Sequence, residues 1–215
     1  MALKPVVLAL SRSGEATAHR VAGVLGAQVH GRVSRVDRAD AFFDNALDHA
    51  RDLFAAGVPI VGVCASGILI RAVAPLLADK LSEPPVLSIS DDGAVVVPLL
   101  GGHRGANRLA ADISDALGSV AAVTTAGDVA LGVALDAPPA GWRLVNRTDA
   151  KGAMAALLGG AGAQVDGDAP WLRDLPAGTG VKISATMARQ TDLGPAHLQF
   201  APQRVTLGVG CARDC

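Results

Sequence analysis

The sequence predicts an α/β protein in which an open, mostly parallel sheet with flanking helices is followed by a second, smaller αβ domain. Short apolar runs at residues 6–10, 58–63 and 120–124 have the length of buried strands, and stripes of helical periodicity separate them. Hydrophobic residues make up 50% of the chain but aromatic residues only 3%, so its core is built from small and aliphatic side chains. Such a composition suits helices packed on a parallel sheet.

The chain begins with alternating strands and helices. The elements expected, in order, are a strand at 6–10, a helix after the turn at 11–14, a strand at 28–33, a helix at 40–56, a strand at 58–63 and a helix at 68–80 interrupted at Pro75. Strands at 86–90 and 94–100 flank Asp91, Asp92 and Gly93, which predicts a hairpin. The sheet is therefore expected to include one antiparallel pair.

The composition changes after the first 128 residues. Residues 1–128 form the predicted amino-terminal domain, and the Pro- and Gly-rich stretch at 129–141 is a predicted linker. Residues 142–203 contain a helix and weaker strands, which predict the smaller domain. We expect residues 204–215 to begin a further domain that this chain does not contain.

Charge and cysteine content exclude several classes of function. A formal net charge of −1 gives no general attraction to nucleic acid or to an anionic membrane. The sequence lacks a long apolar span or a signal peptide, which predicts a cytoplasmic protein. Cys64, Cys211 and Cys215 do not form a disulfide framework, and their spacing does not predict a metal site.

The turn at residues 101–105 is the first candidate for a ligand site. Gly101, Gly102 and Gly105 permit backbone conformations closed to other residues, and the start of the next helix presents unpaired N–H groups. With Arg104 and Arg108 nearby, the pattern indicates an anion site. A tight turn with two solvated arginines is an equally good interpretation of this turn by itself.

The ends of several strands carry further polar residues. Ligands of open α/β sheets collect at the carboxyl ends of strands, so we expect the loops at 11–14, 65–67, 101–105 and 124–128 to converge. Arg71, one helical turn beyond Gly67, would then join Arg104 and Arg108 around a polycarboxylate. His103 could cap a helix, bind a carboxylate or carry a proton.

Four motifs in order resemble one known family. They lie at residues 67–77, at Asp92-Gly93, at 98–110 and at 124–128, and together they resemble the CbiG family of cobalamin biosynthesis. Residues 207–213 look like the start of that family's carboxy-terminal region. The resemblance implies a cobalt-precorrin-5A hydrolase, which opens the ring-A δ-lactone of the macrocycle and expels C20 with its methyl group as acetaldehyde.

Such a reaction needs a base for water, donors for an oxyanion and cations for the substrate's carboxylates. His103 is the candidate base, and the N–H groups at 102–105 are candidate donors. The candidate substrate-binding residues are Gly67, Arg71, Gly101, Gly102, Arg104, Gly105, Asn107, Arg108, Thr124, Thr125 and Asp128. No cofactor or metal of the protein's own is expected, because cobalt would arrive inside the substrate.

Two other functions remain open. The Arg-Gly-Ala-Asn string at 104–107 looks like versions fused ahead of a precorrin-3B C17-methyltransferase. The chain could thus be a non-catalytic tetrapyrrole-binding module for a fused or associated methyltransferase, or an αβ module for another small anion. The expected partners are a precorrin or cobalt-precorrin and that methyltransferase, without nucleic acid or membrane.

Overall fold

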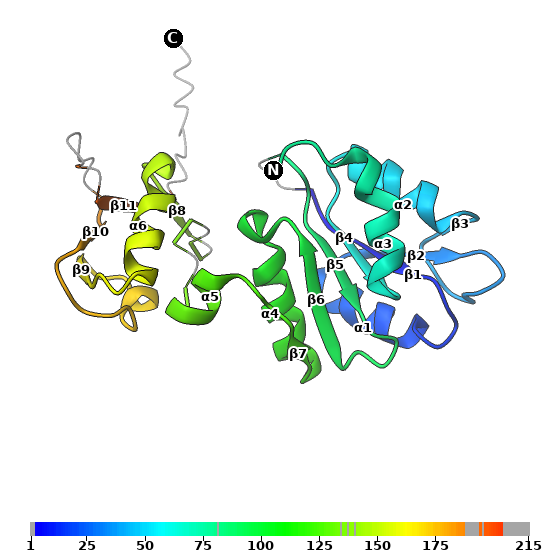
Figure 1. Ribbon diagram of the computed structural model, residues 1–215. Helices are drawn as coiled ribbons and strands as arrows, with labels where there is room; N and C mark the ends of the chain where they lie inside the picture. The colour runs from blue at the N-terminus through cyan, green and yellow to red at the C-terminus, as the bar shows by residue number, and fades with distance from the viewer. Residues whose placement is uncertain are drawn as a thin grey trace, which may run out of the picture. The chain divides into compact units, whose positions relative to one another are not determined.

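The computed structural model describes residues 3–80, 82–133, 135–136, 138–139, 141–187, 194 and 196–203. The chain divides into two compact units, one ending at Thr125 and the other beginning at Ala126 (Figure 1). No helix among the described residues is long and apolar enough to cross a bilayer.

The first unit is built on a mixed sheet whose strands run in the order β3-β2-β1-β4-β5-β6-β7. These strands are β1 (Val6–Ala9), β2 (Gln28–Arg32), β3 (Ala41–Phe43), β4 (Ile60–Val63), β5 (Val86–Ile89), β6 (Val95–Leu100) and β7 (Val120–Ala121). β1 to β5 are parallel, β6 is antiparallel to β5, and β7 is parallel to β6. The predicted mostly parallel sheet and its hairpin at Asp91 to Gly93 are confirmed.

Helices cover both faces of this sheet (Figure 1). The helical segments are α1 (Glu15–Leu25), α2 (Ala46–Ala55), α3 (Ser66–Val73), the short 3-10 segments η1 (Ala74–Leu76) and η2 (Gly102–Arg104), and α4 (Ala106–Leu117). Alternate residues of β1 point to opposite faces: Val7 packs with α1 and α4, whereas Leu8 packs with α2 and α3. Two apolar clusters therefore hold the strands between two helical layers.

The predicted helix at 40–56 is wrong at its start, because β3 occupies residues 41–43 and α2 begins only at Ala46. Asn45 has an extended backbone, and its side-chain oxygen accepts hydrogen bonds from the N–H groups of Leu47 (2.9 Å) and Asp48 (3.3 Å). This is an N-cap, which fixes where the helix begins. Phe43 fits the helical stripe in sequence, but it is buried from the strand.

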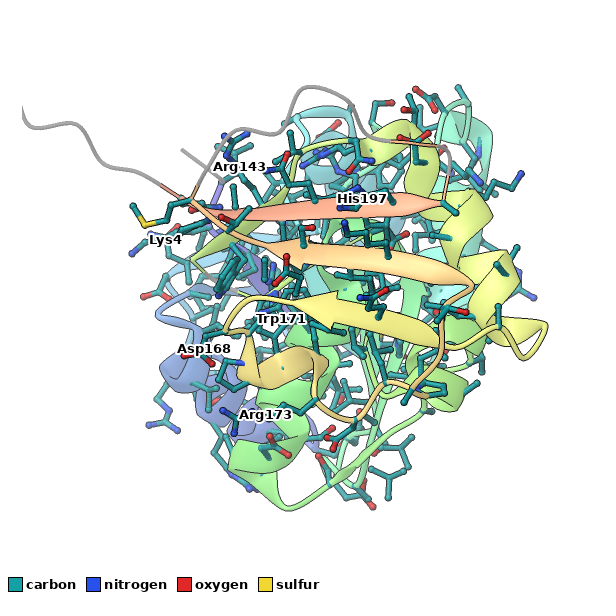
Figure 2. All side chains as sticks on the ribbon, turned by 90° about the vertical axis from the view of Figure 1, so that its left-hand side faces the viewer. Lys4, Arg143, Asp168, Trp171, Arg173 and His197 are labelled. Carbon is teal, nitrogen blue, oxygen red and sulfur yellow. The ribbon has the colours of Figure 1, made fainter. Side chains whose placement is uncertain are left out.

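The second unit has its own sheet, of order β8-β11-β10-β9. Its elements are α5 (Ala126–Leu131), β8 (Trp142–Leu144), η3 (Arg147–Asp149), α6 (Ala150–Leu158), β9 (Ala163–Asp166), η4 (Pro170–Leu172), β10 (Val181–Ala185) and β11 (His197–Pro202). β9, β10 and β11 are parallel and lie side by side (Figure 2). β8 is antiparallel to β11. The predicted second, smaller αβ domain is confirmed.

The border between the units differs from the predicted linker at 129–141. Leu131 and Leu135 lie within that stretch, yet both are buried in the apolar cluster of the second unit. Proline and glycine predicted a linker, but burial of these two leucines attaches the segment to the second unit. The segment 204–215, expected to begin a further domain, lies outside the described residues.

Candidate functional site

The direction of β6 divides the predicted site between two edges of the first sheet. We call the edge where β1 to β5 begin the amino edge and the edge where they end the carboxyl edge. Leu100, the last residue of β6, pairs with Val86, the first residue of β5, so the turn at 101–105 lies at the amino edge. The loops after β1 and β4 lie at the carboxyl edge. The expected convergence of the four loops is therefore wrong.

The amino edge does bring together two of the predicted segments. Because β7 runs parallel to β6, Thr124 and Thr125 follow it at the same edge as the 101–105 turn. Asn107 donates a hydrogen bond from Nδ2 to Oγ1 of Thr125 at 2.9 Å. The candidates Gly101, Gly102, Arg104, Gly105, Asn107, Arg108, Thr124 and Thr125 thus belong to one edge.

The backbone of the turn is partly committed to its own hydrogen bonds. Gly101 and Gly105 have φ of +74° and +105°, which favours glycine at both positions. The N–H of Arg104 donates to the Gly101 carbonyl at 2.8 Å, and the N–H of Gly105 donates to the Gly102 carbonyl at 3.2 Å. These two groups cannot also serve an oxyanion, so the expected set of donors at 102–105 is reduced.

Two predicted residues, His103 and Asp128, are described by their backbones alone. The side chains of His103 and Asp128 lie outside the described part of the chain, although both backbones belong to helical segments, η2 and α5. The assignment of His103 as the base and of Asp128 as a substrate-binding residue stays a prediction.

The remaining predicted pair, Gly67 and Arg71, lies at the carboxyl edge. Arg71 reaches back along α3, where its Nη1 donates to the Gly67 carbonyl at 3.1 Å. A β-carbon on Gly67 would lie 2.8 Å from that nitrogen, so the absence of a side chain gives the guanidinium its room. The structure separates this pair from Arg104 and Arg108.

The carboxyl edge is hollowed where the strand order reverses. From β1 the chain builds β2 and β3 on one side, then β4 and β5 on the other, and such a switch point is where open α/β sheets form their ligand crevice. One cavity of about 430 Å³ is lined by Leu10, Ser11, Arg12, Arg32, Ser34 and Arg35. A second, of about 450 Å³, is lined by Leu10, Arg32, Asp44, Asn45, Ala46, Leu47, Ile68 and Arg71. We call these adjoining hollows, which share Leu10 and Arg32, the arginine bay.

The loop that carries two of these arginines is anchored from beneath. Ser34 has φ of +61°, an uncommon value for a residue other than glycine, and the N–H groups of Arg35 and Val36 both donate to the Arg32 carbonyl at 3.1 Å. The Val36 side chain is buried in the core. The backbone of the loop is thus fixed while its arginines remain exposed.

Glu15 holds the far end of the same loop. Its carboxylate accepts a hydrogen bond from the N–H of Asp37 at 2.8 Å and lies 3.3 Å from Nε of Arg38. The hydrogen bond from Asp37 is the main reason that the pKa of Glu15 is lowered. A charged carboxylate on α1 therefore ties the loop to the helix.

Asp91 joins the first and fifth strands at the floor of this edge. Its Oδ2 accepts hydrogen bonds from the hydroxyls of Ser11 (3.0 Å) and Ser13 (2.5 Å), and its carbonyl accepts one from Thr17 Oγ1 (2.7 Å). A β-carbon on Gly14 would lie 2.7 Å from Cγ1 of Val63, so close packing requires glycine here. These contacts fix Ser11 at the wall of the bay.

Neither Cys64 nor the serine–histidine pair of the second unit provides an accessible nucleophile. Burial raises the pKa of the Cys64 thiol to about 12. In the second unit Oγ of Ser184 lies 2.7 Å from Nε2 of His197 on β11 (Figure 2), but Ser184 is only 1% exposed. Among the described residues no three His, Cys, Asp or Glu side chains gather to hold a metal ion.

The sequence reasoning missed Arg12, Arg32 and Arg35. The available signals were the Ser-Arg-Ser-Gly turn after β1 and the spacing of Arg32, the last residue of β2, and Arg35 at i and i+3. Taken together, the sheet order, the two helical layers and the bay define the first unit as a doubly wound α/β domain with a cationic crevice at its switch point.

Comparisons with known proteins identify the family. The family model described as "Cobalamin synthesis G N-terminal" matches residues 48–128. A cobalt-precorrin-5A hydrolase of Salmonella typhimurium is 30% identical over 239 residues, covering 99% of this chain and 68% of that protein. One from Priestia megaterium is 35% identical over 85 residues, 39% of this chain and 23% of that protein. The chain belongs to the CbiG family of cobalamin biosynthesis.

A solved structure shares the fold. A cobalamin biosynthesis protein G homologue from Sulfolobus solfataricus superposes with a TM-score of 0.50 at 20% identity. The match covers 94% of this chain and 61% of that one. This chain therefore spans about two thirds of the Salmonella protein and somewhat less of the Sulfolobus chain.

Proposed function

We propose that this protein is a hydrolase of cobalamin biosynthesis that opens the ring-A δ-lactone of cobalt-precorrin-5A and releases acetaldehyde. The observation that carries the proposal is the 30% identity, over 99% of this chain, with the Salmonella protein named for that substrate. The four ordered motifs of the sequence support the same activity.

The reaction consumes one water. A base takes a proton from the water, whose oxygen attacks the lactone carbonyl, and the ester oxygen leaves as the ring opens. The freed oxygen on C20 then becomes the aldehyde carbonyl as the bond from C20 to the macrocycle breaks, and the electron pair of that bond stays on the macrocycle. The fragment made of C20 and its methyl group departs as acetaldehyde, and the proton taken from the water returns to the products. Substrate plus water therefore equals opened macrocycle plus acetaldehyde. His103 is our candidate base, and the neighbouring N–H groups of Gly102 and His103 are candidates to stabilise the oxyanion.

The other groups at the amino edge would hold the substrate. Arg104 and Arg108 follow one another at i and i+4 and suit carboxylate arms. The hydrogen bond between Asn107 and Thr125 joins the start of α4 to the segment after β7. With Thr124, these residues give the proposal a defined set of positions to test.

Trapping of acetaldehyde tests the proposed reaction. The chain is incubated with cobalt-precorrin-5A, and the aldehyde is captured and measured; formation above the protein-free rate supports the hydrolase. His103→Ala should lower the rate by about two orders of magnitude or more if the histidine is the base. Asp112→Asn, an exposed change on α4, is the matched control and should turn over normally.

The main alternative gives a different result in the same assay. A non-catalytic tetrapyrrole-binding module would bind the substrate saturably and release no aldehyde. Unchanged turnover in His103→Ala would remove the histidine from the mechanism while leaving the hydrolase intact.

A further inference from the structure

We propose that the arginine bay at the carboxyl edge is a binding site for a polycarboxylate macrocycle, separate from the turn at 101–105. The inference rests on the proposed function for the identity of the macrocycle, but its evidence is the bay itself. The two sites lie at opposite edges of one sheet, because β6 runs antiparallel to β5.

The charges of the bay favour an anion. Its lining residues include four arginines, Arg12, Arg32, Arg35 and Arg71, against one carboxylate, Asp44. Neither Arg32 nor Arg35 has a carboxylate partner in the part of the chain that the structure describes. The guanidinium of arginine is a planar group of hydrogen-bond donors that matches the geometry of a carboxylate. Arg32 and Arg35 are therefore suited to bind the carboxylates of a ligand.

The other two arginines can adjust to a ligand. Arg12 pairs with Asp37 at 2.7 Å, but both side chains are mostly exposed, at 73% and 63%, and such a pair is weak. Arg71 uses Nη1 for the Gly67 carbonyl, which leaves its remaining N–H groups for a ligand. Arginines thus enter the bay from the loop after β1, from the end of β2 and its loop, and from α3.

The apolar residues of the bay favour a ligand that has an apolar surface as well as carboxylates. Leu10, Ala46, Leu47 and Ile68 line the second cavity beside Arg32 and Arg71. A small inorganic anion would leave these side chains without contacts, whereas a macrocycle with acid arms would cover them and satisfy the arginines together. The combination points to a tetrapyrrole bearing several carboxylates.

The site is built before a ligand arrives. The loop with Arg32 and Arg35 is anchored through Val36 and Glu15, and Asp91 fixes Ser11 at the wall. A fixed backbone reduces the ordering cost of binding. The bay therefore does not depend on a rearrangement of the sheet edge.

Binding of uroporphyrin, a porphyrin with an acetate and a propionate on every pyrrole ring, tests the proposal directly. Its fluorescence is followed as the intact chain is added, with inorganic phosphate titrated separately as the small-anion probe. We expect saturable uroporphyrin binding that weakens with salt, and much weaker binding of phosphate. Equal affinity for the two probes would overturn the assignment of a macrocycle.

Variants locate the site. Arg32→Ala and Arg35→Ala should each weaken uroporphyrin binding by about tenfold or more, and the double variant further. Arg20→Ala removes an exposed charge from α1 outside both cavities and should bind normally. Because all three side chains are exposed, unchanged thermal unfolding is expected and serves as the check of the fold.

The outcomes separate this proposal from the hydrolase. Binding that depends on Arg32 and Arg35 supports the bay even if no acetaldehyde is released. Binding that is unaffected in both variants contradicts the bay even if the chain releases acetaldehyde. Loss of uroporphyrin binding in Arg104→Ala, with full binding in Arg32→Ala, would assign the measured binding to the turn at 101–105 and overturn the bay as a macrocycle site.

Discussion

Two histidines of the first unit form a hydrogen-bonded pair whose protonation depends on burial. Nδ1 of His30 and Nε2 of His49 are hydrogen-bonded at 2.9 Å, and the His49 ring stacks on Phe43 with centroids 4.6 Å apart. Burial lowers the pKa of both histidines, and their mutual repulsion lowers that of His30 further. Asp40 and Asp52 oppose these shifts only in part. The folded protein therefore favours the neutral pair.

This pair predicts that stability falls in mild acid. Above a pH of about 6.5 the imidazoles are neutral in both states, and their contribution is complete. As the pH falls below that value, the unfolded chain binds protons first, so the free energy of unfolding decreases towards the folded pKa values. Urea unfolding between roughly pH 7.5 and pH 5.5 should show this loss, and His49→Gln should reduce the pH dependence. An identical pH dependence in the variant would contradict it.

Gly101 predicts a strong effect of a single methyl group. Its φ is +74°, and a β-carbon would lie 2.8 Å from Cα of Pro85, so Gly101→Ala should destabilise the protein by about 1–3 kcal/mol. Gly23→Ala is the control, since Gly23 lies in α1 with open space around it; that change should stabilise by about 0.5–1 kcal/mol. Chemical unfolding of both variants measures the difference. A neutral effect of Gly101→Ala would refute the strain.

Single residues also show what the sequence could and could not predict about the site. Gly101 and Gly105 predict the turn at 101–105, because glycine readily adopts the positive φ found at both positions. The sequence gives no comparable signal for Arg32 and Arg35, because exposed arginines are common. Their position at the cavity depends on the burial of Val36 and on the hydrogen bond from the N–H of Asp37 to Glu15. The bay depends on contacts between segments distant in sequence.

Among the elements, the direction of β6 explains why the predicted site residues lie at two edges of the sheet. Its strand character and the hairpin before it could be predicted from Asp91, Asp92 and Gly93. The rule that ligands collect at the carboxyl ends applies to parallel strands, and the hairpin reverses β6. Because β6 is antiparallel to β5, the turn at 101–105 lies at the opposite edge of the sheet from Arg71.

The start of α2 gives a prediction at the same scale. Asn45 caps the helix with two hydrogen bonds to backbone N–H groups, so Asn45→Ala should lower the free energy of unfolding by about 1 kcal/mol. Asn45→Asp retains an acceptor and should preserve most of that energy. Equal stability of the Ala and Asp variants in urea unfolding would show that the cap contributes nothing.

The molecule as a whole contains separate apolar cores for its two units. Alternating strands and helices predicted both units, because burial periodicity is a local signal. The border at Ala126 was harder to predict, since the burial of Leu131 and Leu135 depends on α6 and the second sheet. Both tryptophans, Trp142 and Trp171, lie in the second unit.

Tryptophan fluorescence should therefore report on the second core. Leu198→Ala removes a fully buried side chain from β11 and should lower the fluorescence-detected stability by about 2–5 kcal/mol. Val61→Ala opens a cavity in the core of the first unit. This change should leave the tryptophan fluorescence transition unchanged, but the helices of the first unit should unfold under milder conditions. A shift of the fluorescence transition in Val61→Ala as large as in Leu198→Ala would show that the two cores unfold together.

The mass of the macrocycle after incubation tests the central claim, that this chain hydrolyses cobalt-precorrin-5A. We predict a product whose mass equals that of the substrate plus one water less one acetaldehyde, formed in proportion to the protein added. Recovery of the substrate at unchanged mass, from a sample in which the chain is folded and the substrate is bound, would contradict the claim.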